Sequence, residues 1–282
     1  MRSLGIVISV LLAAPSTAIS SATAAPATCQ GKVATINVDS PDGVTTAVPG
    51  TASDDVISTT GSVEIEALAG DDVICMETGY VNGGDGTDAV QVQGSDAREF
   101  LDVRFAEDLD LSLGGGRDSV VLIYSSGGAG VVRGGSGADS VIVASRQSVR
   151  ADLRQHHLSI DETGSYDLRG FEEIQATGRA VTLKGDDRGN ALSGLTSACR
   201  ITIKGRGGKD DLRVHGNGLG LVPQGGECRN RSTRMLGGGG NDYLRGGLAF
   251  NDTLLGGPGR DTADGRDGFD TCRAEVRRRC ER

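Results

Sequence analysis

Residues 237–273 read GGGGNDYLR-GGLAFNDTLL-GGPGRDTAD-GRDGFDTCR, four units in which a glycine-rich turn ends in aspartate. Glycine allows the positive φ angles that a tight repeated turn needs, and aspartate offers a hard oxygen ligand. The eighth position of each unit supplies one side chain that can point inward. The pattern is therefore typical of a repeated coil that holds metal ions at its turns.

The same six-residue pattern, G-G-x-G-x-D, runs through the rest of the chain. It occurs in full at Gly83–Asp88, Gly134–Asp139, Gly237–Asp242 and Gly256–Asp261. Incomplete copies keep an apolar residue two positions after the aspartate or its substitute, namely Ile57, Ile74, Val120, Leu192 and Leu212. We therefore expect one repeated supersecondary unit over most of the chain.

These residues resemble the haemolysin-type (RTX) calcium-binding repeat, G-G-x-G-x-D-x-U-x, in which U is a large apolar residue. The resemblance implies an all-β fold, a right-handed parallel β-roll in which Ca²⁺ lies between loops stacked on successive coils. It places Asp242 opposite Asp261 and Asp252 opposite Asp270. The metal ligands that it implies are the carboxylates of Asp88, Asp139, Asp242, Asp252, Asp261 and Asp270, supported by backbone carbonyl groups of Gly237, Gly239, Gly256 and Gly259.

The repeat departs from this pattern in several places. Asp252 follows a one-residue insertion that puts Asn251 at the usual ligand position, and Arg266 replaces the second glycine of its unit. Upstream aspartates stand at positions 55, 72, 88, 118 and 139, with gaps of 17, 16, 30 and 21 residues. Spacings close to two repeats indicate one ligand loop per coil on a single edge, with sparse calcium and some coils held by apolar packing alone.

The N-terminus has the form of a Sec-type signal peptide. Met1-Arg2-Ser3 gives a short basic region, GIVISVLLAA an apolar region, and Ala22-Thr23-Ala24 a cleavage motif. No other stretch approaches the roughly 18 apolar residues that a membrane span needs. We therefore predict cleavage near Ala24 and a secreted, extracellular protein.

Six cysteines lie beyond this cleavage site, and an even number in an exported chain predicts disulfides. Six cysteines allow 15 pairings, of which we favour the pairing of sequence neighbours. Residues eight apart on a straight helix would be about 12 Å apart, too far to bridge, so CRAEVRRRC must turn back on itself. The favoured pairs are Cys29–Cys75, Cys199–Cys228 and Cys272–Cys280.

Composition fits one elongated domain with a thin core, because 37% of the residues are hydrophobic but only 3% are aromatic. Short β-branched segments such as DSVVLIY and CRITIKG predict strands, and helix is almost absent. Between Arg146 and Thr177 the repeat disappears, which we interpret as degenerate coils. The predicted organisation is a signal peptide (1–24), an N-terminal cap (25–48), a degenerate solenoid (49–228), the tandem calcium repeats (229–272) and a C-terminal disulfide cap (273–282).

No catalytic constellation is found in the sequence. Neither H-E-x-x-H nor G-x-S-x-G occurs, Ser136 lies in a repeat loop, and His215 is isolated. His156 and His157 are adjacent, so on a strand they would point to opposite faces. Glu172 and Glu173 allow the alternative of a β-helical polysaccharide-modifying enzyme, a lyase or an epimerase, although neighbours on a strand diverge.

The net charge of −9 argues against nucleic acid and anionic membranes as partners. Without calcium, carboxylates stacked at coil spacing repel one another, and with calcium the binding free energy becomes folding free energy. We therefore expect a non-enzymatic, calcium-binding protein with a structural, adhesive or surface-associated role. Its cell-surface or polysaccharide partner stays open, as does the alternative of a scaffold that has lost calcium.

Overall fold

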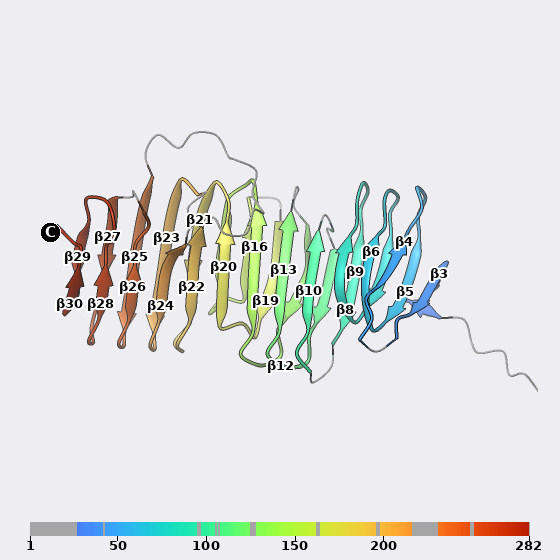
Figure 1. Cartoon of the computed structure of the whole chain (residues 1–282), viewed down its shortest axis with the longest axis horizontal. Helices are drawn as coiled ribbons and strands as arrows, with labels where there is room; N and C mark the ends of the chain where they lie inside the picture. Colours follow the sequence, from blue (N-terminus) through green and yellow to red (C-terminus); the bar gives the residue numbers. More distant parts are fainter. Residues whose placement is uncertain are drawn as a thin grey trace, which may run out of the picture.

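The computed structural model shows an elongated all-β solenoid whose coils follow one another from the N-terminus to the C-terminus (Figure 1). It describes residues 27–41, 43–94, 97–104, 106, 108–124, 128–161, 164–195, 198–215, 231–248 and 251–281. No helix occurs among these residues. They therefore contain no helix long and apolar enough to cross a membrane. The predicted signal peptide lies outside the described residues.

Two long sheets form the walls of the solenoid. The 12-stranded sheet contains, in spatial order, β30 (Val276–Arg278), β28 (Thr262–Asp264), β26 (Tyr243–Arg245), β24 (Asp211–His215), β22 (Ala191–Leu195), β20 (Glu173–Thr177), β16 (Ser140–Ser145), β13 (Ser119–Tyr124), β10 (Phe100–Arg104), β8 (Thr78–Asn82), β6 (Ser62–Glu66) and β4 (Thr46–Pro49). All its neighbouring strands pair in parallel.

The 14-stranded sheet faces the 12-stranded sheet across the core. It contains β29 (Thr271–Arg273), β27 (Asn251–Leu255), β25 (Ser232–Gly239), β23 (Arg200–Gly207), β21 (Ala180–Lys184), β17 (Val149–Asp152), β18 (His157–Ile160), β19 (Gly164–Arg169), β14 (Ala129–Arg133), β11 (Asp108–Ser112), β9 (Ala89–Gln93), β7 (Val73–Met76), β5 (Val56–Thr60) and β3 (Ile36–Asp39). Two short pairs complete the fold, β1 (Thr28–Cys29) with β2 (Lys32–Val33) and β12 (Gly115–Gly116) with β15 (Ser136–Gly137).

The core is the thin aliphatic stack that the sequence predicts. In each strand alternate side chains point inward, and the residue two positions after the loop acid is buried in every repeat. Leu254 pairs in register with Cys272, so the cysteine occupies the same core position in the last repeat. Burial of one aliphatic stripe per strand thus fixes the register of the coils.

Two rows of loops join the sheets. The first loop row leads from the 14-stranded into the 12-stranded sheet and comprises residues 113–118, 134–139, 185–190, 205–210, 237–242 and 256–261. It runs along the bottom of the solenoid in Figure 1, where β12 is labelled. The second loop row leads back and includes residues 50–55, 67–72, 83–88 and 265–270.

The upstream aspartates do not share a single edge, so that prediction is wrong. Asp55, Asp72 and Asp88 end loops of the second loop row, whereas Asp118 and Asp139 end loops of the first. The physical reason is the gap of 30 residues between Asp88 and Asp118, which corresponds to about one and a half coils rather than to whole coils.

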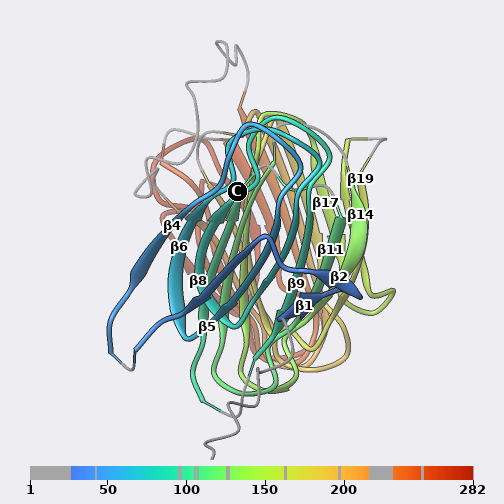
Figure 2. The same ribbon diagram turned by 90° about the vertical axis from the view of Figure 1, so that its right-hand side faces the viewer.

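The region between Arg146 and Thr177, where the repeat disappears, is not a run of degenerate coils, so that interpretation of the sequence is wrong. β17, β18 and β19 form an antiparallel meander inserted into the 14-stranded sheet, while β16 and β20 pair directly in the other sheet. Looking along the stack, Figure 2 shows β11, β14, β17 and β19 together on one side. The insertion explains why one sheet has two strands more than the other.

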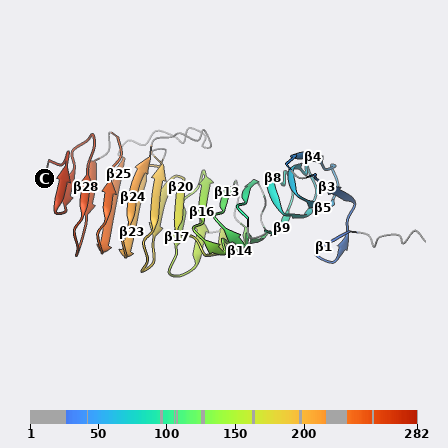
Figure 3. The ribbon, with the colours of Figure 1, turned by 60° about the horizontal axis from the view of Figure 1, so that its bottom comes forward.

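Disulfides fasten both ends of the described chain, and two of the three predicted pairs are confirmed. Cys29–Cys75 joins the β1–β2 hairpin to β7 with a Cα–Cα distance of 5.6 Å, and Cys272–Cys280 closes the last turn at 5.9 Å. Cys199 is also disulfide-bonded, but its predicted partner Cys228 lies outside the described residues. Figure 3 shows the β1 strand beside the first coils, in which β3 and β4 already belong to the two sheets.

Candidate calcium loops

The glycines of the repeat have distinct tasks in the loop at 237–242. Gly238 and Gly240, in the second and fourth positions, have φ angles of 114° and 130°. At Gly237 a Cβ atom would lie 2.3 Å from Oδ2 of Asp242 and 2.6 Å from the carbonyl oxygen of Gly256. The first glycine therefore leaves room for the carboxylate of its own loop and for the carbonyl group of the next coil.

The carboxylates form a ladder along each loop row. The backbone N–H of Asp242 donates to Oδ1 of Asp261 at 2.9 Å, and that of Asp252 donates to Oδ1 of Asp270 at 2.8 Å. The two pairs expected from the repeat spacing thus lie on adjacent coils. The same bond joins Asp55 to Asp72, Asp72 to Asp88, Glu99 to Asp118, Asp118 to Asp139, Asn190 to Asp210, and Asp210 to Asp242.

Each ladder bond uses only one of the two carboxylate oxygens. The second oxygen, Oδ2, is buried and accepts no hydrogen bond within the described part of the chain at the following aspartates: Asp72, Asp118, Asp139, Asp210, Asp242, Asp261 and Asp270. A buried charged oxygen without a partner is costly, so a bound cation would stabilise it. Asp88, which is fully buried, also belongs to the ladder through Oδ1, which accepts the N–H of Asp72 at 3.1 Å.

Sequence reasoning missed three of these residues as candidate ligands. Asp72, Asp118 and Asp210 end incomplete repeats, and their Oδ2 atoms have the same unpartnered position as that of Asp242. The apolar residue two positions later was the available signal, because it marks the acid as the last residue of a loop. These loops lack some of the glycines of the full repeat, so the sequence does not show that their acids are equivalent to Asp242.

Burial also raises the pKa of several ladder carboxylates. Burial raises the pKa of Asp252 to about 7 and that of Asp210 to about 6. At Asp118 burial and the nearby charges of Glu99 and Asp139 raise the pKa to about 6. Without calcium, ionisation of these buried carboxylates is unfavourable. A bound divalent cation would offset that free-energy cost.

Asp252 differs from the other members of the C-terminal array because of the insertion before it. Its Oδ2 accepts the N–H of Gly247 at 2.8 Å. The same oxygen lies against Gly246, where a Cβ atom would overlap it, as a Cβ atom at Gly237 would overlap Asp242. Asn251 stands in the ligand position by sequence, but its side chain accepts the N–H of Phe269 at 3.1 Å. The insertion therefore shifts the acid by one residue and keeps it in the ladder.

The carbonyl groups that the resemblance implies are placed unequally. The carbonyl oxygen of Gly256 accepts the N–H of Gly238 at 2.8 Å and lies, like Oδ2 of Asp242, against Gly237. That of Gly237 lies equivalently against Gly205 with Oδ2 of Asp210. Gly239 pairs with Gly207 in the extension of β25, and Gly259 packs against the carbonyl oxygen of Gly240. The first-position carbonyls are thus the ones that converge with a carboxylate.

This arrangement suits calcium but not a site made of side chains alone. No group of three or more His, Cys, Asp or Glu side chains within the described ranges could hold a metal ion. Calcium takes six to eight hard oxygens in flexible geometry, and a carboxylate oxygen beside a backbone carbonyl supplies two of them from one loop pair. The donor set therefore fits a cation bound by carboxylates and backbone together.

In two loops, backbone N–H or hydroxyl groups of the protein donate hydrogen bonds to the side chain at the sixth position of the repeat. Oδ2 of Asp55 accepts the backbone N–H of Thr51 at 2.7 Å and the Thr51 hydroxyl at 2.9 Å. At 185–190 the sixth residue is Asn190, whose Oδ1 accepts the N–H of Asp186 at 2.8 Å. These loops offer less to a cation than the loop at 237–242.

Glutamates extend the ladders at the C-terminal end and beside the meander. Oε2 of Glu275 accepts the N–H of Asp261 at 2.7 Å, and Oε2 of Glu281 accepts that of Asp270 at 2.5 Å. Oε2 of Glu172 accepts the N–H of Asp139 at 3.0 Å, whereas Glu173 is exposed on β20. Glu172 thus takes part in the ladder, whereas Glu173 is the first residue of β20.

Neither a family model nor a curated protein sequence matches this chain. The resemblance to the RTX repeat therefore depends on the repeated residues themselves and on the loop geometry that they adopt.

Proposed function

We propose that this protein is a secreted, non-enzymatic, calcium-binding β-roll protein of the RTX type, with a structural, adhesive or surface-associated role. The observation that carries the proposal is the column of buried, unpartnered carboxylate oxygens at Asp210, Asp242 and Asp261, stacked on successive coils. Each lies beside the first-position glycine of its own loop.

Calcium would be held between stacked loops by these carboxylates and by first-position carbonyls such as those of Gly237 and Gly256. The cation would supply the positive charge that the column lacks. The protein supplies the rest, since glycine turns bring the oxygens together and the aliphatic stack fixes their spacing. Weak modular sites of this kind suit millimolar extracellular calcium.

The disulfides indicate an oxidising compartment, which agrees with export. The predicted signal peptide and secretion belong to this proposal. A non-catalytic role is supported by the position of Glu172, whose Oε2 already accepts the backbone N–H of Asp139. Mass spectrometry of the exported protein should find an N-terminus close to residue 25.

Calcium titration by calorimetry and circular dichroism tests the proposal. We expect heat of binding near millimolar calcium and a higher melting temperature, since a ligand at 100 times its Kd adds about 2.7 kcal/mol of stability. The double variant Asp242→Asn/Asp261→Asn should lose most of this gain, whereas Asp110→Asn, at an exposed ion pair with Arg133, should keep it. Wild-type protein that shows neither heat nor a melting shift in millimolar calcium would contradict the proposal.

A further inference from the structure

One arginine occupies a glycine position in the first loop row. Arg206 is the second residue of the loop at 205–210 and aligns with Gly238 of the following coil. Its φ angle is 82°, in the left-handed region that is unfavourable for a residue with a side chain. A residue kept there against this cost needs a compensating interaction.

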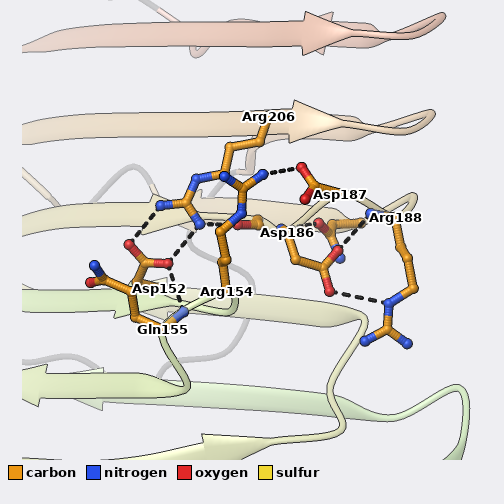
Figure 4. Close-up of polar contacts among 9 residues, drawn as sticks. Asp152, Arg154, Gln155, Asp186, Asp187, Arg188 and Arg206 are labelled. Carbon is orange, nitrogen blue, oxygen red and sulfur yellow. Dashed lines mark hydrogen bonds and ion pairs between the residues drawn. The ribbon is translucent and has the colours of Figure 1, made fainter.

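That interaction joins β23 to β17, which lie on either side of β21 in the 14-stranded sheet. The Arg206 guanidinium donates to both carboxylate oxygens of Asp152, at 2.7 and 2.8 Å, and to the carbonyl oxygen of Gly185 at 2.6 Å. Asp152 ends β17 of the meander, and β21 lies between β17 and β23. Figure 4 shows Arg206 facing Asp152 across this intervening coil.

The Asp152 carboxylate is buried, with 5% of the residue's surface exposed. Lys184 lies 3.3 Å from its Oδ2, and the backbone N–H of Gln155 donates to its Oδ1 at 3.2 Å. Burial opposes its ionisation, but the hydrogen bonds from Arg206, Gln155 and Lys184 together with the charge of Arg206 outweigh this effect, and the pKa of Asp152 is lowered. Its charge is therefore balanced by the protein itself.

The set of groups around this guanidinium matches the set at the calcium loops. At 237–261 the Oδ2 atom of Asp242 lies close to the first-position carbonyl of Gly256 and accepts no hydrogen bond from the described part of the chain. At 152–190 a carboxylate converges with the first-position carbonyl of Gly185, and a guanidinium lies between them. The aspartate ladder is also interrupted here, since the loop ends in Asn190.

We propose that Arg206 is a built-in cation that takes the place of calcium where the meander joins the solenoid. This inference rests on the calcium-binding proposal and names the residue that determines which loops need the ion. The segment from β17 to β22 is then calcium-independent and separates an upstream group of loops, ending at Asp139, from a downstream group beginning at Asp210.

Hydrogen exchange in calcium chelator tests the proposal through Arg206→Gln, which keeps polarity and removes the charge. In wild-type protein we expect the amides of β17, β21 and β22 to stay protected while those of β26 and β28 exchange. The variant should lose protection of β17 and β21 by at least ~10-fold, because a buried carboxylate is left without its main partner. Unchanged protection of β17 and β21 in the variant would overturn the proposal.

Two further variants keep the test decisive. Asp152→Asn/Arg206→Gln removes both charges and should recover most of the protection lost in Arg206→Gln, since replacing both partners is less costly than removing one. Arg154→Gln is the matched control, because Arg154 pairs with Asp187 at an exposed site of the same region. Loss of protection in Arg154→Gln equal to that in Arg206→Gln would contradict a specific role of Arg206.

The two proposals fail differently. If wild-type protein shows no calcium response but Arg206→Gln loses protection and the double variant recovers it, the internal cation stands and calcium binding fails. If wild-type protein binds calcium and β17 and β21 become exposed in chelator together with β26 and β28, calcium binding stands and the internal cation fails.

Discussion

The loops at 237–242 and 185–190 have the same length and lie in the same loop row, yet they satisfy their polar groups in opposite ways. In the first, the Asp242 carboxylate keeps one oxygen without a partner. In the second, Asn190 is neutral, and the nearby carboxylate of Asp152 binds Arg206. If the proposed calcium binding holds, one coil geometry takes its cation either from solution or from its own side chains.

The two regions also differ in their expected response to the solvent. We expect the loops from Asp210 to Asp261 to gain stability from an ion whose concentration varies, and the segment from β17 to β22 not to do so. A solenoid tolerates this difference because each coil contacts only its neighbours. The predictions below test the comparison, beginning with the largest effect.

Calcium removal should have the largest effect. In chelator the strands β26 to β30 should lose their protection from hydrogen exchange, because stacked carboxylates then repel one another without a counter-charge. Addition of millimolar calcium should restore it. Strands β26 to β30 that stay fully protected in chelator would show that calcium is not needed for their folding.

Gly237→Ala should weaken calcium binding by at least ~10-fold, because its Cβ atom would overlap the Asp242 carboxylate and the Gly256 carbonyl group. The matched control is Gly239→Ala, where a Cβ atom would have nothing within 4 Å. Calorimetry on both variants measures the difference. Equal affinities would mean that the geometry at Gly237 does not form part of the site.

Removal of the last disulfide should destabilise the C-terminal coils moderately. Cys272 and Cys280 close a loop with a sequence separation of 8 residues, for which chain entropy predicts a loss of about 2–3 kcal/mol on replacement by serine. Denaturant melts in calcium check this value. A loss confined to β29 and β30 in hydrogen exchange would agree with independent coils, and global unfolding would not.

The two regions should respond to pH in opposite directions. Burial raises the pKa of Asp252 to about 7 and that of Asp210 to about 6, so the folded calcium-free protein binds more protons than the unfolded chain between about pH 4 and 7. The stability of the calcium loops should therefore fall as pH rises through this range. Calcium should remove the fall, because the ion replaces the proton.

Asp152 has a lowered pKa, so its contribution is present above its unfolded value near 3.9 and is lost as pH falls below it. Hydrogen exchange in calcium-free buffer measures both regions when pH 5 is compared with pH 8 for the loops from Asp210 to Asp261, and pH 3 with pH 5 for the segment that contains Asp152. Protection of β26 that rises with pH in chelator would contradict the assignment of unpartnered carboxylates.

Much of the fold could be predicted from single positions of the repeat. The residue two positions after each loop acid, such as Leu244 or Leu254, is buried as expected, and the pairs Asp242–Asp261 and Asp252–Asp270 follow from a spacing of one coil. The Cys272–Cys280 bridge was predicted from the pairing of sequence neighbours, and the reach of a disulfide then required a turn between the two residues. These features are local, or repeat at a fixed interval.

The features that the sequence did not reveal depend on distant contacts. Asp152 and Arg206 are 54 residues apart, and no local pattern connects them. The strands of the meander have the same alternation as parallel strands, so their direction is set by pairing rather than by composition. The glutamates 172, 275 and 281 join the ladders because a longer side chain reaches the same N–H group from outside the repeat.

The most direct test of the account is a crystal structure with calcium, measured at a wavelength where the anomalous signal of the ion can be located. The account predicts anomalous peaks beside the Oδ2 atoms of Asp210, Asp242 and Asp261, and none between Asp152 and Gly185, where Arg206 lies. Empty loops at 237–261 in millimolar calcium, or an ion between Asp152 and Gly185 with Arg206 displaced, would contradict it.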